Sequence, residues 1–178
     1  NRHVLNGLYK WKGWSIQNQG SLLNSNSLLT YSKFFRNQTQ TRYHYKKNWI
    51  GASIRAEDNQ EKVKLTNQYS ALSQKFTEYG TFIGRGDSTR VYTEIGYLHR
   101  VNDSIENGFL KRVNTSNSYY LKSKLIQNET NDLSVFINYR NLKYSDKSLK
   151  SEPSLNSRLL YTSRYFGQLL QNTMAFET

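Results

Sequence analysis

Apolar and polar residues alternate along most of the chain. Three stretches show the pattern most clearly: "RVYTEIGYLHR" (90–100), "YYLKSKLI" (119–126) and "LSVFINY" (133–139). In the last of these, one face carries Leu133, Val135, Ile137 and Tyr139, and the other carries Ser134, Phe136 and Asn138. A period of two indicates β-strands, because successive side chains of a strand point to opposite faces. The pattern predicts a mostly β protein.

Segments rich in Gly, Asn, Asp and Ser interrupt the alternation and are predicted to be turns or loops: 17–21, 35–39, 56–62, 84–89, 101–108, 128–132 and 144–154. These residue types tolerate turn dihedrals or bond their own backbone. The spacing leaves room for strands of about 10 to 15 residues, which exceeds the usual five or six. We therefore expect an all-β fold, an antiparallel up-and-down meander of long strands that is part of an outer-membrane β-barrel or of an extended sheet.

Composition agrees with strands and narrows the chemistry. The 178 residues predict a single β domain over 1–178. The absence of cysteine excludes disulfides, thiolate metal sites and cysteine nucleophiles. A formal charge of +12 favours acidic partners such as anionic lipids, acidic glycans or nucleic acid. Because the chain starts at Asn1 and both ends read as strands, we expect a fragment of a longer chain.

The predicted strand faces are only partly apolar. The mean hydropathy is −0.81, and neither face of the segment 75–83 is a clean apolar band: Lys75, Thr77, Tyr79, Thr81 and Ile83 oppose Phe76, Glu78, Gly80 and Phe82. A wide barrel with a polar lumen, or a sheet that rises above the membrane, would accommodate this pattern.

The strand-rich stretches 73–100 and 154–177 resemble the β-strand regions of large outer-membrane and cell-surface proteins of Bacteroidota-type Gram-negative bacteria. The likeness lies in the alternation and in the abundance of Tyr, Asn and Lys, and it covers most of the chain. It implies a non-catalytic structural, transport or assembly role at the outer membrane or cell surface, without a cofactor. The implied partners are membrane lipid or lipopolysaccharide, other envelope proteins, and the remaining strands of the parent chain.

The tripeptide Arg85, Gly86 and Asp87 lies within "GRGDST" (84–89). Cell-adhesion proteins offer this tripeptide to integrins, so one hypothesis is an adhesion loop. The other hypothesis is a turn, since two glycines supply positive φ and Asp87 can bond the backbone. We favour the turn, as the connection of a hairpin from about Gln74 to Arg100.

A second candidate region is "TRYHYKKNW" (41–49), in which basic and aromatic residues interleave. Single-strand nucleic-acid binders use this combination, but the recognition motifs of ribonucleoprotein folds are absent. Alternation places Arg42, His44 and Lys46 on one face, with Tyr43, Tyr45 and Lys47 on the other. An envelope strand with interfacial tyrosines is the better interpretation, and nucleic acid is not an expected partner.

Exposed aromatic residues suggest an alternative function, a soluble extracellular domain that binds glycans. Its candidate contacts are Trp11, Trp14, Tyr43, Tyr45 and Trp49. Trp11 and Trp14 would point to opposite faces of one regular strand, unless a bulge at Gly13 re-aims one of them. An adhesin that uses the loop 85–87 is a third reading.

Enzyme chemistry has little support in the sequence. His3, His44 and His99 are scattered and have no metal-ligand spacing. Glu78 and Glu94 could face each other as a glycosidase pair across the 76–99 hairpin, but neighbouring basic residues make ion pairing the simpler role. No catalytic, metal or cofactor-binding residue is predicted.

Overall fold

A computed structural model describes residues 2–70, 73–87, 91–106, 108–127, 131–165 and 168–177. The described residues form strands and contain no helix. The strands are β1 (Arg2–Trp11), β2 (Trp14–Asn26), β3 (Thr30–Tyr45), β4 (Asn48–Val63), β5 (Gln68–Tyr69), β6 (Gln74–Gly86), β7 (Tyr92–Glu106), β8 (Phe109–Gln127), β9 (Asn131–Tyr144), β10 (Glu152–Tyr165) and β11 (Gln168–Glu177). The all-β prediction is confirmed.

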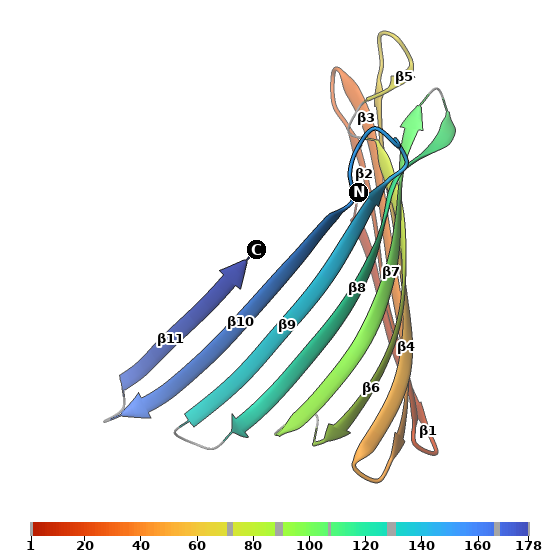
Figure 1. Cartoon of the computed structure of the whole chain (residues 1–178). Coiled ribbons are helices and arrows are strands. Elements are labelled where there is room, and N and C mark those ends of the chain that lie inside the picture. The colour runs from red at the N-terminus through yellow and green to blue at the C-terminus, as the bar shows by residue number, and fades with distance from the viewer. Residues whose placement is uncertain are drawn as a thin grey trace.

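Ten of these strands form one antiparallel meander. The sheet order is β1-β2-β3-β4-β6-β7-β8-β9-β10-β11, and the two-residue β5 pairs with β4. The sheet is twisted, so that β7–β11 face the viewer in Figure 1 while β1–β4 are seen nearly edge-on. It is open, because β1 and β11 are the two ends of this order. The predicted meander of long strands is therefore confirmed, in a sheet that does not close on itself.

The two ends of the sheet differ in their connections. At the turn end, at the bottom of Figure 1, two-residue turns join β1 to β2 (Lys12–Gly13) and β3 to β4 (Lys46–Lys47). At the loop end, at the top, three residues (27–29) join β2 to β3, whereas longer segments separate β4 from β6, where β5 lies, and β9 from β10 (145–151). The two longest segments between paired strands thus lie at the same end of the sheet, but other connections at that end are short, so the asymmetry of membrane barrels is present only in part.

Three of the seven predicted turn segments, 84–89, 101–108 and 144–154, coincide in part with connections between strands, whereas the described residues of 128–132 belong to β9. The hairpin at 84–89 is one of them: β6 ends at Gly86, and the Asp87 N–H donates to the Val91 carbonyl at 2.8 Å. The segment 144–154 contains the loop between β9 and β10. Strand β7 continues to Glu106, so the connection expected over 101–108 is shorter than predicted. Residues 88–90 and 128–130 lie outside the described residues.

Three predicted turns are wrong, because 17–21, 35–39 and 56–62 lie inside β2, β3 and β4. Their polar side chains are satisfied across the sheet rather than by a turn. The Asn18 side-chain amide, for example, donates to Thr39 Oγ1 at 2.7 Å. The sequence missed the turn at Lys46–Lys47, where Lys46 adopts a φ of +55° without a glycine.

The cross-strand register divides the sheet into two unlike faces. On one face, three consecutive rows of described residues cross nine strands, β1–β4 and β6–β10, without a single Asp, Glu, Lys or Arg. We call these rows the charge-free band. They are Trp11-Trp14-Tyr43-Ile50-Ile83-Ile95-Leu121-Ile137-Ser157, Tyr9-Ile16-Thr41-Ala52-Thr81-Tyr97-Tyr119-Tyr139-Leu155 and Gly7-Asn18-Thr39-Ile54-Tyr79-His99-Asn117-Asn141-Pro153.

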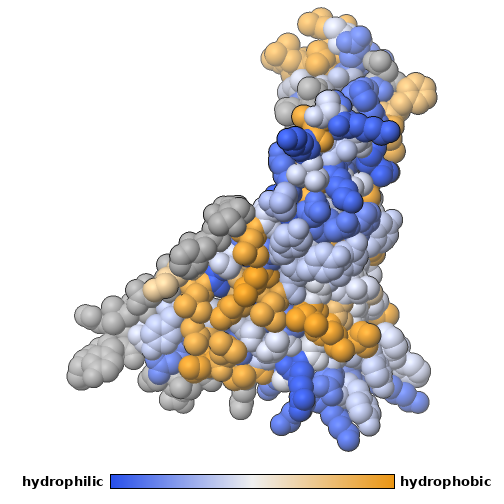
Figure 2. Space-filling view, viewed as in Figure 1, coloured by the Kyte–Doolittle hydropathy of each residue, from blue (hydrophilic) through white to orange (hydrophobic). Residues whose placement is uncertain are grey.

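The opposite face, called here the charged face, has ionisable residues at the interleaved positions. The three rows between and beside those of the band contain Lys10, Arg42, Arg55, Glu78, Arg100, Arg140 and Glu152. Figure 2 shows hydrophobic side chains of the charge-free face gathered over β7–β10 toward the turn end, with hydrophilic side chains beyond them. The segregation of charge to one face follows from the period-two alternation of the sequence.

Candidate functional site

Burial on the two faces is the reverse of that in a water-soluble sheet. Within the charge-free band, Ile50 is 58% exposed and Tyr119 is 57% exposed. On the charged face, Trp49, Phe82 and Glu94 are buried. Antiparallel sheets in water usually place the apolar face on a core and the polar face toward solvent. The described residues provide no layer that covers the charge-free band.

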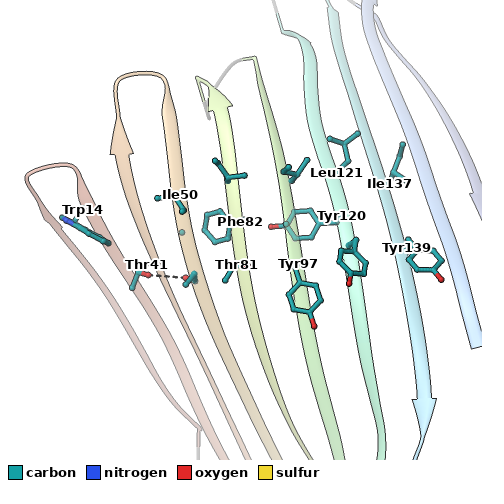
Figure 3. Close-up of a pocket in the computed structure, with 16 residues that line it drawn as sticks. Trp14, Thr41, Ile50, Thr81, Phe82, Tyr97, Tyr120, Leu121, Ile137 and Tyr139 are labelled. Carbon is teal, nitrogen blue, oxygen red and sulfur yellow. Dashed lines mark hydrogen bonds between the residues drawn. The ribbon is translucent and has the colours of Figure 1, made fainter. Parts of the chain in front are cut away.

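An open groove of about 950 Å³ runs across the strands within the band. The register places Ile50, Ile83, Ile95, Leu121 and Ile137 along one side of the groove and Thr81, Tyr97, Tyr119 and Tyr139 along the other. Figure 3 labels Ile50, Leu121 and Ile137 from the first side and Thr81, Tyr97 and Tyr139 from the second. It is hollow near β4 because Ala52 and Thr81 are small. The rings of Tyr97 and Tyr119 lie with centroids 5.2 Å apart. The groove fits apolar chains rather than a polar substrate.

Aromatic residues border the band at the turn end. Trp11 and Trp14 are direct partners across the Lys12–Gly13 turn, so they lie on the same face. Neither of the two predicted arrangements, one regular strand or a strand with a bulge at Gly13, is found, because the two residues belong to two strands of a hairpin. Tyr43 and Tyr45 share their face, and the Trp14 and Tyr43 ring centroids are 5.0 Å apart.

Trp49 does not belong to this aromatic group. It lies on the charged face beside Arg42 and is only 3% exposed. The five predicted glycan contacts are therefore split between the two faces, and four of them, Trp11, Trp14, Tyr43 and Tyr45, remain together on the charge-free face.

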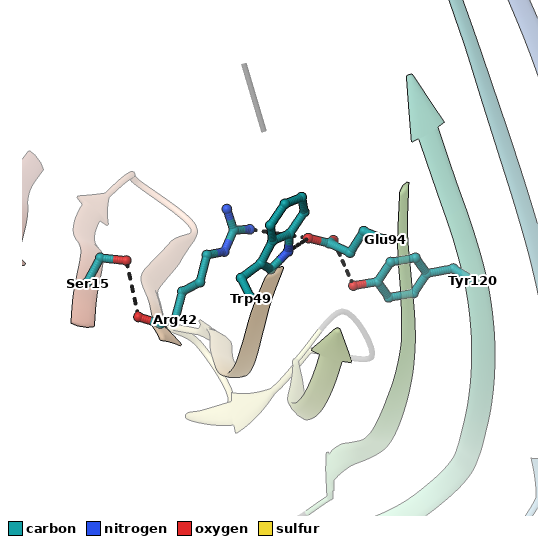
Figure 4. Close-up of polar contacts among 5 residues, drawn as sticks. All are labelled: Ser15, Arg42, Trp49, Glu94 and Tyr120. Atoms are coloured by element: carbon teal, nitrogen blue, oxygen red, sulfur yellow. Dashed lines mark hydrogen bonds and ion pairs between the residues drawn. The ribbon is translucent and has the colours of Figure 1, made fainter. Parts of the chain in front are cut away.

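Glu94 is the centre of a buried polar network on the charged face (Figure 4). Its Oε2 accepts from the Trp49 indole N–H at 3.0 Å and from Arg42 Nη2 at 3.3 Å. Its Oε1 accepts from the Tyr120 hydroxyl at 3.2 Å. Arg42 comes from β3, Trp49 from β4, Glu94 from β7 and Tyr120 from β8. We call these four residues the Glu94 network.

Glycines make the network possible. Gly84 stands between Trp49 and Glu94 in the register, and a Cβ there would lie 2.2 Å from the indole ring. Gly96 pairs with Tyr120, and a Cβ there would lie 2.3 Å from the phenol ring. Both rings thus lie flat over a neighbouring strand instead of standing up from the sheet. Sequence reasoning missed this network, since the glycine opposite each ring is visible only once the register is known.

The Glu94 network is suited to cross-linking strands. Both carboxylate oxygens have donors from other strands, and charge-assisted hydrogen bonds are stronger than neutral ones. Further along the same face, Glu57 forms ion pairs with Arg36 and Arg55 at 2.5 Å each. The Arg100 guanidinium lies 3.7 Å from the Phe76 ring centroid. These contacts hold charged side chains in fixed positions along the charged face.

The acidic pair considered from sequence is not brought together. Glu78 pairs with Arg100, whereas Glu94 lies six residues away along β7. At the rise of an extended strand, that offset is roughly 20 Å, beyond the roughly 9.5 Å that an inverting glycosidase spans. His3, His44 and His99 lie on β1, β3 and β7. Among the described residues, no three His, Cys, Asp or Glu side chains are grouped to hold a metal.

The tripeptide at 85–87 spans the end of a strand. Arg85 pairs with Asn48 and Gly86 with Tyr92, so both belong to β6. Gly86 has a φ of +119°, and its N–H donates to the Lys47 carbonyl at 2.8 Å. Only Asp87 lies past the strand. The backbone of the motif is therefore engaged in turn formation and in contact with the neighbouring hairpin.

The fold and the two faces define an open, amphipathic antiparallel sheet built from sequential hairpins. No protein-family model, curated protein or solved structure matches the chain. Among the described residues, no helix is long and apolar enough to cross a membrane.

Proposed function

We propose that the chain forms part of the wall of a transmembrane β-barrel in the outer membrane of a Gram-negative bacterium, with a non-catalytic structural, transport or assembly role. The observation that carries this proposal is the charge-free band, which crosses nine strands opposite a charged face. Membrane barrels alternate lipid-facing apolar residues with lumen-facing polar residues in this way.

The absence of charge from the band has a physical explanation in a bilayer. A Lys or Arg on the lipid-facing side of a barrel costs about 2 to 4 kcal/mol at the membrane midplane. The chain contains 25 Lys and Arg and 13 Asp and Glu, yet none occupies the three rows of the band. In water such exclusion would bring no advantage, because a charged residue on an exposed strand face is well solvated.

Polar members of the band lie mainly in its row nearest the loop end. Several of them bond to one another, which lowers the cost of placing them in lipid. Asn117 Oδ1 accepts from the Tyr97 hydroxyl at 2.7 Å and lies 2.8 Å from His99 Nδ1. Tyr and His side chains at such a border have an apolar body and a polar tip, which suits a membrane interface.

The open sheet edges also bear on the proposal. A bilayer has no water to satisfy unpaired backbone groups, so a spanning sheet must close. The free edge of β1 would therefore pair with further strands, supplied by the rest of a longer chain or by another envelope protein. The Glu94 network would then face the lumen and stiffen one part of the wall.

A second candidate function is a soluble extracellular domain that binds glycans. The exposed pair Trp11 and Trp14, next to Tyr43, favours it because sugar rings stack on flat aromatic faces. This function requires the charge-free face to contact water, whereas the barrel wall requires it to contact lipid. The two proposals therefore differ in a measurable property of one face.

Spin labelling at two adjacent positions tests the proposal. Tyr139 lies in the charge-free band and Arg140 on the charged face, and both are exposed. Because the chain has no cysteine, Tyr139→Cys and Arg140→Cys each give a single labelling site. With the chain folded in phosphatidylcholine vesicles, the label at 139 should collide with dissolved oxygen and the label at 140 with a water-soluble nickel complex. Equal access of the nickel complex to both sites would overturn the barrel-wall proposal.

A further inference from the structure

Basic residues gather at the turn end of β1–β6. Lys12 lies in the β1–β2 turn, Lys46 and Lys47 form the β3–β4 turn, and Arg85 lies near the end of β6. We call these four residues the basic rim. All four side chains are exposed. Arg85 lies on the charge-free face of β6, two residues past Ile83, which is the last residue of β6 within the charge-free band.

Two hollows lie side by side at the rim. Lys10 and Lys12 line one of about 360 Å³ together with Trp11 and Trp14. Lys46 and Lys47 line another of about 610 Å³. His44 borders both hollows and Trp49 lines the second, and both side chains belong to the charged face, so the hollows open beside the rim and not on the charge-free face. Among the described residues, Asp87 is the only acidic one that lines either hollow. Four lysines against one carboxylate leave the hollows with a clear excess of positive charge.

Backbone hydrogen bonds join the three turns and fix the spacing of the cations. The His44 N–H donates to the Gly13 carbonyl at 2.8 Å, and the Gly86 N–H donates to the Lys47 carbonyl at 2.8 Å. Two of the ammonium groups also lie near aromatic rings. Lys12 Nζ is 5.2 Å from the Trp11 centroid, and Lys46 Nζ is 5.5 Å from the Tyr45 centroid.

We propose that the basic rim binds the phosphate groups of anionic phospholipids, while Trp11, Trp14 and Tyr45 enter the border between headgroups and acyl chains. This inference rests on the proposed function, because it requires the charge-free band to lie in a bilayer. Tryptophan and tyrosine settle at that border, and lysines close to a membrane surface are attracted to its anionic lipids. The order of the residues along the strands, apolar band, aromatic rings and then cations, matches the order of layers in a lipid leaflet.

The turn lengths favour a headgroup phosphate over a more distant anion. Two-residue turns keep Lys12, Lys46 and Lys47 within a side chain's length of the aromatic rings. The phosphates of a phospholipid lie directly outside the acyl region, at the level that interfacial aromatic residues occupy. An extended polysaccharide layer lies further out, beyond the reach of two-residue turns.

Vesicle flotation tests the inference with two matched variants. Lys46→Gln/Lys47→Gln removes two charges from the rim, and Lys147→Gln/Lys150→Gln removes two charges from the loop end. Glutamine keeps much of the side-chain length, and it tolerates the positive φ of residue 46 as well as lysine does. Partition of each chain is measured into phosphatidylcholine vesicles and into vesicles that also contain phosphatidylglycerol.

The unchanged chain should prefer the anionic vesicles. The rim variant should lose that preference by roughly 30-fold, since each lysine near the surface contributes about fivefold. The loop-end variant should keep the preference. Equal losses in both variants, or no preference in the unchanged chain, would overturn the inference. Failure of the proposed function is a different result, because the labels at 139 and 140 would then show no difference in lipid access.

Discussion

Trp49 and Glu94 are joined by a 3.0 Å hydrogen bond although a complete strand, β6, lies between them. The indole passes over Gly84, where the backbone has no side chain to block it. The bond therefore fixes the relative position of strands that are not neighbours in the backbone ladder. A slip of one residue in either strand would move one partner to the other face of the sheet.

Glu94→Gln tests how much the Glu94 network contributes to the free energy of unfolding. Glutamine keeps the size of the side chain but removes the charge that neutralises Arg42, whose side chain is only 24% exposed. Breaking one partner of a largely buried ion pair costs about 3 to 5 kcal/mol, so the free energy of unfolding should fall by about 3 kcal/mol. Urea titration of the chain folded in detergent micelles, followed by tryptophan fluorescence, measures the loss.

Glu106→Gln is the matched control for that experiment. Glu106 forms an ion pair of 3.1 Å with Lys111, but both side chains are more than half exposed. Exposed ion pairs contribute at most about 1 kcal/mol. Equal losses from the two substitutions would show that the Glu94 network does not stabilise the sheet.

Gly96→Ala tests the close contact between an aromatic ring and the neighbouring strand. A Cβ at residue 96 would lie 2.3 Å from the Tyr120 ring, so the ring must leave its place over β7. Overpacking of this kind costs about 1 to 3 kcal/mol, and the hydrogen bond from Tyr120 to Glu94 should weaken. Chemical unfolding measures the cost.

Gly7→Ala is the control for the glycine substitution, because nothing lies within 4 Å of a Cβ at that position. It should leave stability unchanged within about 0.5 kcal/mol. Removing the ring in the double variant Gly96→Ala/Tyr120→Ala should make the added methyl group harmless, compared with Tyr120→Ala alone. A cost that persists without the ring would contradict the proposed contact.

The period-two alternation was sufficient to predict the fold class. Leu133, Val135, Ile137 and Tyr139 share a face as expected, and the same alternation in the other strands produces the two faces of the sheet. A meander was predictable because turn signals followed several of the long strands, such as β6, β7 and β9. Residues on a face that looked mixed in isolation, such as Tyr79, Thr81 and Ile83, became part of a charge-free band only after nine strands were aligned.

The remaining features depend on register, which the sequence alone does not reveal. Asn and Gln runs resembled turns because their cross-strand partners, such as Thr39 for Asn18, lie far away in the sequence. A regular strand and a bulge at Gly13 are both compatible with the spacing of Trp11 and Trp14, and only the pairing of β1 with β2 shows that Lys12 and Gly13 form a turn between them. The Glu94 network requires Trp49, Gly84 and Glu94 to lie side by side, and their positions in the sequence do not indicate this.

The loop between β9 and β10 should respond to acid at an unusually low pH. The Asp146 carboxylate accepts from the Ser148 N–H at 2.9 Å and from the Ser148 hydroxyl at 2.7 Å, and these bonds lower its pKa. A lowered pKa stabilises the folded loop at pH values above the unfolded pKa of about 4. That contribution is lost as the pH falls through the lower, folded pKa.

Nuclear magnetic resonance titration of the Asp146 carboxyl carbon measures this effect. Ser148→Ala removes the hydroxyl donor but keeps the backbone donor, so the titration midpoint should rise part of the way toward the ordinary value. An unchanged midpoint would show that the serine hydroxyl does not hold the carboxylate.

Gly86→Ala separates the two hypotheses for the tripeptide at 85–87. The backbone at Gly86 has a φ of +119°, and a Cβ there would lie 2.3 Å from the Val91 carbonyl oxygen. Strain of this kind costs about 1 to 3 kcal/mol, so the substitution should destabilise the β6–β7 hairpin. Asp87→Glu keeps the charge and should leave the unfolding free energy nearly unchanged.

If the tripeptide is an adhesion loop, Asp87→Glu should reduce cell attachment more than Gly86→Ala does, because integrin recognition needs the carboxylate of Asp87 at its own distance from Arg85. If Asp87→Glu abolishes attachment while stability is intact, the motif is a binding site as well as a turn; if the unchanged chain does not support attachment, its role is to reverse the chain.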